Sequence, residues 1–127
     1  MPCESTVLVS PKVAKGKGVD ARLAKGAEKA MLEAALKHFK KHKAVKATKE
    51  KEGFEFEPRL TTLADEGGTL SCEIESVSHP LGKMKPVANA SNSGGLPGGG
   101  ARDVGYLIGE VMKGHVKIVE ANLKRLK

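Results

Sequence analysis

The sequence has few aromatic residues: no Trp, one Tyr and three Phe among 127 residues. A chain of this length suits one domain and can bury a core, and that core must consist mainly of Val, Leu, Ile, Ala and Met. Two cysteines, Cys3 and Cys72, make no disulfide framework, and we expect Cys72 to be a buried thiol. No apolar run approaches the roughly 20 residues of a membrane-spanning helix, so we expect no membrane insertion.

The first five residues, Met-Pro-Cys-Glu-Ser, lack a charged start followed by an apolar stretch. This is not the pattern of a signal peptide. It favours a cytoplasmic location, or an envelope location if the sequence is that of a processed form. We therefore expect a single domain over residues 1–127, with residues 1–5 as a tail.

Alternating polarity and helical periodicity predict an α+β fold in the order β-α-β-β-β-α. Strands are expected at residues 6–14, on either side of an Asp65–Gly68 hairpin turn, and weakly at 83–91. Helices are expected at about 20–43, capped by Asp20, and from about 102 onward. Strands that alternate in polarity have one dry face. We therefore predict an antiparallel sheet of three to four strands with two amphipathic helices on one face.

A glycine-rich stretch, residues 92–101, precedes the last helix and contains Gly94-Gly95-Leu-Pro-Gly-Gly-Gly100. A P-loop needs Lys and then Ser or Thr after its last glycine, whereas Ala101 and Arg102 follow here. The dinucleotide-binding fingerprint needs a β-α-β unit, which a final helix cannot complete. We interpret the stretch as a connector, with an anion site at the helix start as the alternative.

The histidines do not suggest catalysis or metal binding. His38 and His42 are four residues apart, but the surrounding lysines oppose a divalent ion. His115 lies on the apolar face of the last helix near Asn122, where a structural role is expected, and His79 precedes Pro80 in an expected exposed bend. No acid, base and nucleophile set is visible. We expect no catalytic residue, cofactor or metal, and a protein that is not an enzyme.

Helical glycines form a second pattern. Gly105 and Gly109 are four residues apart on the last helix. Gly114 adds a third helical glycine. Because each internal glycine costs a helix roughly 1 kcal/mol, we expect all three to be retained for close packing.

Charge is distributed unevenly along the chain. The net charge is +7 overall, +7 over residues 1–52, −3 over 53–100 and +3 over 101–127. Alternation places four carboxylates on the outer face of the sheet: Glu55, Glu57, Glu73 and Glu75. Lysines of the first helix point the other way, and the candidate interaction residues there are Lys37, Lys40, Lys41 and Lys43. Complementary faces can stack head to tail, which predicts a non-enzymatic assembly module that forms a homo-oligomer or binds a protein with an acidic surface.

The alternative is a sequence-nonspecific nucleic-acid or polyanion binder. Its candidate residues are Lys37, Lys40, Lys41, Lys43, Lys46, Lys49 and Lys51, which could neutralise phosphates. Arginine is scarce in this stretch, stacking aromatics are absent, and Glu50 and Glu52 interrupt it.

The segment GFEFEPRLTTLADEGGTLSCEIESVSHPLGKMKPVANASNSGG, Gly53–Gly95, carries a resemblance. A strand that begins at a glycine, a Leu-x-x-Leu turn and a Leu-Ser-Cys strand precede a helix that covers the sheet. This arrangement resembles small bacterial envelope-type α+β domains, those of TolB-type and curli-secretion-type lipoproteins. The resemblance implies a non-catalytic binding or assembly role and no particular functional residues.

Overall fold

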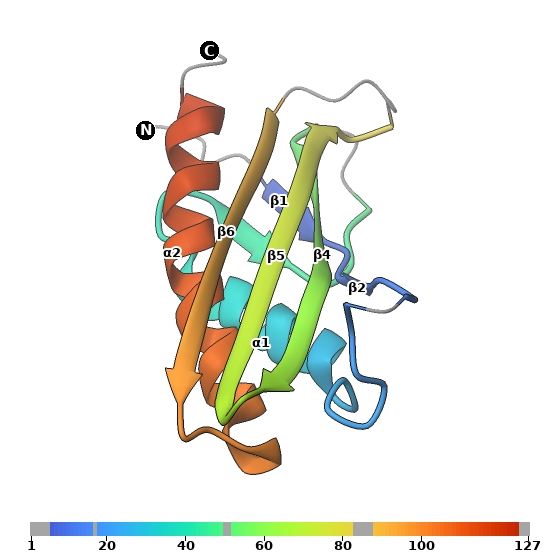
Figure 1. Cartoon of the computed structure of the whole chain (residues 1–127). Helices are drawn as coiled ribbons and strands as arrows, with labels where there is room; N and C mark the ends of the chain where they lie inside the picture. The colour runs from blue at the N-terminus through green and yellow to red at the C-terminus, as the bar shows by residue number, and fades with distance from the viewer. Residues whose placement is uncertain (1–5, 17, 50–51, 83–87, 125–127) are drawn as a thin grey trace.

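The computed structural model describes residues 6–16, 18–49, 52–82 and 88–124. The elements are β1 (Thr6–Val9), β2 (Lys12–Val13), α1 (Ala27–His38), β3 (Lys43–Val45), β4 (Phe54–Glu66), β5 (Thr69–Pro80), β6 (Ala88–Pro97), η1 (Ala101–Asp103) and α2 (Val104–Lys124). Figure 1 shows α1 and α2 together on one side of a single sheet. The expected α+β class and the placement of both helices on one face are confirmed.

Among the described residues the sheet is mixed and has six strands, so the prediction of three to four antiparallel strands is wrong in these details. The strand order is β3-β1-β4-β5-β6, and β2 also pairs with β4. β1 is parallel to both β3 and β4, while β4, β5 and β6 form an antiparallel meander. Parallel pairing arises because α1 carries the chain over the sheet from β1 to β3. Alternating polarity shows which face of a strand is buried but does not identify its neighbour.

The hairpin between β4 and β5 is confirmed. Gly67 and Gly68 both have positive φ, +58° and +83°, as a type I′ turn requires. Beyond the turn, Leu70, Cys72 and Ile74 all face the core and are 0–1% exposed. Burial raises the pKa of the Cys72 thiol to about 12, with a further contribution from the charge of Glu73, so Cys72 is an unreactive core residue.

Two irregularities adapt β4 to its neighbours. The register with β5 shifts between Leu60 and Thr62, and this bulge lets both Leu60 and Leu63 face the core although they are three residues apart. Pro58, which has no N–H to donate, lies beside the interruption at Pro11 that separates β1 from β2. β4 can therefore contain proline and still lie inside the sheet rather than at its edge.

The first helix is shorter than expected at both ends. Gly26 adopts a left-handed conformation, φ +78°, and α1 begins only at Ala27. Asp20 instead accepts a hydrogen bond from the backbone N–H of Arg22 (2.9 Å) in a preceding turn. At the other end Phe39 is extended, and the next two backbone N–H groups bond to a carboxylate of α2 described below.

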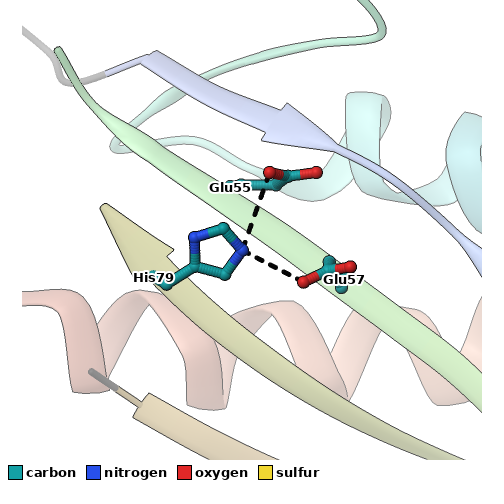
Figure 2. Close-up of side chains that lie close together, drawn as sticks. All are labelled: Glu55, Glu57 and His79. Carbon is teal, nitrogen blue, oxygen red and sulfur yellow. Dashed lines mark hydrogen bonds and ion pairs between the residues drawn. The ribbon is translucent and has the colours of Figure 1, made fainter. Parts of the chain in front are cut away.

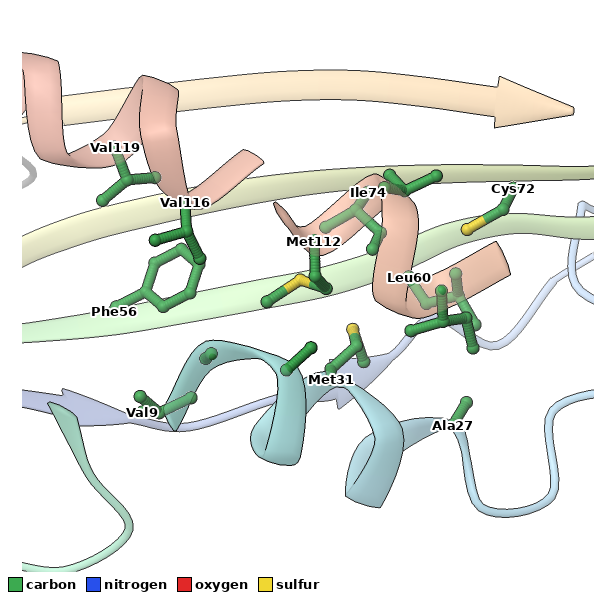
Figure 3. Close-up of a cluster of buried hydrophobic side chains, with 14 of the residues drawn as sticks. Val9, Ala27, Met31, Phe56, Leu60, Cys72, Ile74, Met112, Val116 and Val119 are labelled. Atoms are coloured by element: carbon green, nitrogen blue, oxygen red, sulfur yellow. The ribbon is translucent and has the colours of Figure 1, made fainter. Parts of the chain in front are cut away.

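The core lies between the sheet and the two helices (Figure 3). α1 contributes Met31 and small alanines, and α2 contributes residues such as Met112 and Val116, each fully buried. Ile118 of α2 is 38% exposed. Neither described helix combines the length and apolar character that a membrane-spanning segment requires.

The expected close packing of the α2 glycines is confirmed at Gly114, where a Cβ would lie 3.3 Å from Asn92 Nδ2, but it is wrong at the other two. A Cβ added at Gly105 or Gly109 would have no atom within 4 Å.

The glycine-rich stretch is mostly strand, which corrects the expected connector at residues 92–101. β6 continues through Gly94 and Gly95 to Pro97, and three glycines connect it to η1. A Cβ at Gly94 would lie 2.9 Å from Val111 Cγ2 on α2, whereas a Cβ at Gly95 would meet only ordinary contacts at 3.6 Å. Gly94 therefore lets α2 lie close against β6. The earlier part of the expected strand, residues 83–87, lies outside the described residues.

A chain of hydrogen bonds crosses the core between α2 and the sheet. The Ser76 hydroxyl lies 2.6 Å from His115 Nε2, and His115 Nδ1 lies 2.8 Å from Asn92 Oδ1. Asn92 Nδ2 donates to the Val111 carbonyl (2.9 Å). His115 is 0% exposed, and burial lowers its pKa to about 4. A neutral ring that donates from Nδ1 and accepts at Nε2 satisfies every contact, so His115 is structural; its partner is Asn92 rather than Asn122.

Replacing the two glycines of β6 separately should give opposite results. Gly94→Ala should lower the free energy of unfolding by about 1–3 kcal/mol, because its methyl group meets α2. Gly95→Ala should be neutral or stabilising by up to about 1 kcal/mol, because it restricts the unfolded chain. Urea unfolding followed by circular dichroism measures both. Equal effects would contradict the packing of β6 against α2.

The buried imidazole should make stability depend on pH. Because the pKa of His115 is about 4 in the folded chain and near 6.5 when unfolded, the unfolded chain takes up the proton first. Stability from this group is complete above pH 6.5 and falls by about 3 kcal/mol as the pH drops to 4. Urea unfolding at several pH values should show this fall, and His115→Gln should lack it. Parallel pH profiles for the two proteins would refute the assignment, as would an NMR titration of the ring near pH 6.5.

Candidate functional site

The four predicted carboxylates lie on the outer face of the sheet, opposite the helices. Glu55 and Glu57 are half-buried, Glu73 is half-buried, and Glu75 is exposed. Glu73 Oε1 accepts hydrogen bonds from Thr61 (3.1 Å), the residue at the β4 bulge, and Thr62 (3.4 Å). The four carboxylates form two groups rather than one acidic cluster. Glu55 and Glu57 lie near the start of β4, whereas Glu73 and Glu75 lie on β5 nearer the hairpin turn, opposite Thr62 and Arg59.

The first group surrounds His79, which is opposite Glu55 in the β4–β5 ladder. His79 Nε2 lies 3.0 Å from Glu57 Oε2 and 3.6 Å from Glu55 Oε1 (Figure 2). The two glutamates face the same side because they are two residues apart on a strand. This group of two carboxylates and one imidazole joins the two central strands of the outer face.

His79 is 3% exposed, so the expectation of an exposed bend was wrong. β5 continues to Pro80, and His79 extends the outward series of odd-numbered positions that begins at Glu73. Burial opposes protonation, but hydrogen bonds to the Pro80 carbonyl and Glu57, together with the charges of Glu55 and Glu57, outweigh it and raise the pKa of His79. In β5 the even-numbered residues face the core and the odd-numbered residues face outward. Continuing this alternation to residue 79 could have identified His79 as an outward residue from the sequence.

Beside this group the outer face has a hollow of about 460 Å³. Its lining comes from β2, β4, β5 and β6: Lys12, Glu57, Arg59, Glu75, Ser76, Val77, Asn89, Ala90 and Ser91. Lys12 Nζ lies 3.5 Å from Glu57 Oε1, and Arg59 is opposite Glu75 across the strands. The hollow therefore has cationic and anionic walls, and its carboxylates are partly balanced within the chain.

The predicted lysines do not share one helix face. Six of them are exposed and are distributed over the end of α1, the following loop, β3 and the chain beyond: Lys37, Lys40, Lys41, Lys43, Lys46 and Lys49. Lys51 lies outside the described residues. Burial, followed by the charges of Lys37, Lys113 and Lys40, lowers the pKa of His38. The charge of Glu110 opposes this shift. The three lysines therefore form a local basic cluster, with one carboxylate nearby, where α1 ends beside α2.

One buried carboxylate of α2, which the sequence pattern did not predict, binds the backbone of this basic segment. Glu120 of α2, 8% exposed, accepts hydrogen bonds at Oε2 from the backbone N–H of Lys40 (3.2 Å) and Lys41 (2.7 Å). The same oxygen lies 3.1 Å from Nδ1 of His42, which is also buried. Glu120 thus binds the backbone between the end of α1 and the start of β3. The sequence signal for this role was an acidic residue directly after Val119, next to the apolar face of α2.

No family model matches the sequence, and no curated protein is significantly similar to it. Solved structures do share its fold. One is a protein of the DUF330 family from Xanthomonas campestris, with a TM-score of 0.69, 10% identity, and 96% of this chain and 86% of that chain covered. Another is a hypothetical protein from Chlamydia trachomatis, with a TM-score of 0.62, 9% identity, and 96% and 99% covered.

A third similar structure is the PelC dodecamer from Paraburkholderia phytofirmans, with a TM-score of 0.56, 10% identity, and 87% and 84% of the two chains covered. At such low identity these similarities concern the fold alone. They agree with the broader part of the expected resemblance, because uncharacterised bacterial proteins share this α+β arrangement. The finer resemblance to TolB-type and curli-secretion-type domains stays a prediction.

Proposed function

We propose that this chain is a non-enzymatic assembly module that self-associates, with the outer sheet face of one copy against the basic helix side of another. The observation that carries the proposal is the opposition of charge across one sheet. Glu75 is exposed on the outer face, while the basic cluster of Lys37, Lys40 and Lys113 lies at the helices. Faces of this kind give heterologous contacts, which close into rings or extend into filaments.

Two surfaces of the sheet remain available for such contacts. Within the described part of the chain, no helix covers the outer face (Figure 1). β6 forms one edge of the sheet, and its ten residues, ANASNSGGLP, include no charged side chain. Exposed edges usually carry charges that discourage pairing. An uncharged edge therefore supports contact with a further chain.

The structurally similar PelC from P. phytofirmans is a dodecamer. This supports the proposal because a shared fold offers the same kinds of free surface, namely one sheet face and one strand edge. It does not specify how many copies of the present chain would assemble.

The arrangement of His115 supports a non-enzymatic role. Ser76, His115 and Asn92 are connected as a nucleophile, a base and an orienting group would be, but Ser76 is 5% exposed and His115 is 0% exposed. Ser76 belongs to the lining of the hollow, but its hydroxyl contacts an imidazole on α2, inside the core. A substrate would have to enter the packed core to reach this serine.

Charge reversal on either face should weaken self-association. We expect Glu75→Lys or Lys37→Glu alone to lower the association constant about tenfold or more, because each places like charges opposite one another. An equimolar mixture of the two variants should assemble again, since each contact then joins a reversed face to its complement. Size-exclusion chromatography with light scattering, at low salt and at about 1 M salt where the Debye length is about 3 Å, measures the mass.

Glu66→Lys, the same change at an exposed residue beside the hairpin turn, is the matched control and should assemble like the wild type. A strict monomer at both salt concentrations would reject self-association. An oligomer that is unchanged by either reversal would reject the complementary faces and direct attention to the β6 edge.

Polyanion binding remains the second candidate, favoured by the three lysines that lie close enough to shift the pKa of His38. If it is correct, single-stranded or duplex DNA of arbitrary sequence should bind at low salt, with log K falling linearly as log salt rises. Gel shifts should show weaker binding by Lys37→Gln and Lys113→Gln, while Lys29→Gln, an exposed lysine elsewhere on α1, serves as control. Absence of retardation at low salt would reject this function.

A further inference from the structure

On the outer face, three atoms of the kinds that bind metals converge. One carboxylate oxygen of Glu55, one of Glu57 and one ring nitrogen of His79 all lie within 4.8 Å of one another (Figure 2). His79 is 3% exposed, so its ring is held by packing. The backbone supplies the arrangement: the two glutamates alternate on β4, and β5 brings His79 opposite Glu55.

Each of these side chains has its other polar atom held by a separate group. Ser10 Oγ donates to Glu55 Oε2 (2.7 Å), Lys12 Nζ lies 3.5 Å from Glu57 Oε1, and His79 Nδ1 donates to the Pro80 carbonyl (3.0 Å). Because the bond to Pro80 keeps a proton on Nδ1, loss of the Nε2 proton leaves a lone pair directed at the carboxylates. Outer contacts of this kind orient ligands in metal sites, and here all three ligands have one.

The separations suit a small divalent ion. Ligands held 2.0–2.2 Å from a tetrahedral zinc ion lie about 3.3–3.6 Å apart. The observed distances from His79 Nε2 to the carboxylate oxygens, 3.0 and 3.6 Å, differ little from this range. The imidazole therefore already lies at nearly the separation from each carboxylate that a bound zinc ion requires.

We propose that Glu55, Glu57 and His79 bind one divalent transition-metal ion of the zinc class. One imidazole nitrogen and two carboxylate oxygens are ligands that zinc accepts, and three protein ligands leave a fourth position open. Glu57 also lines the neighbouring hollow, so a ligand held there lies beside the ion. This site is independent of self-association, because it needs only one copy of the chain.

The full chain, freed of any affinity tag and stripped with a chelator, provides the test. Zinc is titrated against a chromophoric competitor, and cobalt absorption in the visible region reports the coordination geometry. We expect one zinc ion per chain whose affinity falls at least about tenfold in Glu57→Gln and in His79→Gln. Zinc should also raise the melting temperature of the wild type. Glu75→Gln, which removes the same charge elsewhere on the outer face, and His38→Gln, which removes another imidazole, should bind as the wild type does.

Because a ligand variant can fail to fold, Ser10→Ala provides a second measurement. It leaves all three ligands in place and removes only the contact that orients Glu55, so zinc affinity should fall about tenfold while the fold persists. The competing state is a protonated His79 that bridges the two carboxylates without a metal. Absence of zinc binding by the wild type, or binding that is equal in the wild type, Glu57→Gln and His79→Gln, would favour that state and overturn the proposal.

Discussion

Coverage of the sheet on one face only is the constraint on which the rest of the structure depends. α1 crosses that face between β1 and β3, and α2 returns over the same face after β6 (Figure 1). Because side chains alternate along a strand, burying Cys72 and Ile74 under α2 fixes the opposite orientation for Glu73, Glu75 and His79. A one-residue slip of β5 would bury these polar groups. The composition of the outer face is therefore a direct consequence of core packing on the inner face.

Sequence reasoning predicted the features that local periodicity and turn chemistry encode. It identified the Gly67–Gly68 turn, the buried positions of β5 and the apolar side of α2, because each repeats within a few residues. It gave β6 only in part, as a weak strand at 83–91 that overlaps the observed Ala88–Pro97 at its start, because the Ser, Asn and Gly residues of β6 have little intrinsic preference for strands. β6 forms because β5 offers a long partner and because Gly94 allows α2 to approach. Tertiary contacts of this kind leave no signal in the strand itself.

The same distinction applies to the candidate site. The orientation of Glu55 and Glu57 followed from alternation, whereas His79 was missed because the following Pro80 suggested a bend. Its carboxylate partners lie on β4, the antiparallel neighbour of β5, whereas the contacts of Ser10 and Lys12 with those carboxylates depend on the parallel pairing of β1 and β2 with β4. Glu120 was missed for a related reason: its partners are the backbone N–H groups of Lys40 and Lys41, about 80 positions away in the sequence.

The group around His79 also lies where the two halves of the sheet meet. Ser10 follows β1, Lys12 is in β2, and both contact carboxylates of β4 that in turn contact a residue of β5. A carboxylate taken partly out of water must be compensated by charge or hydrogen bonds, and here the compensating groups come from three separate places: β2, β5 and the residue after β1. Any cation that replaces the proton of His79 would therefore act on contacts that join the parallel half of the sheet to the antiparallel half. Binding at this position would be coupled to the geometry of the outer face, since the same side chains that would hold the ion also fix the strands against one another.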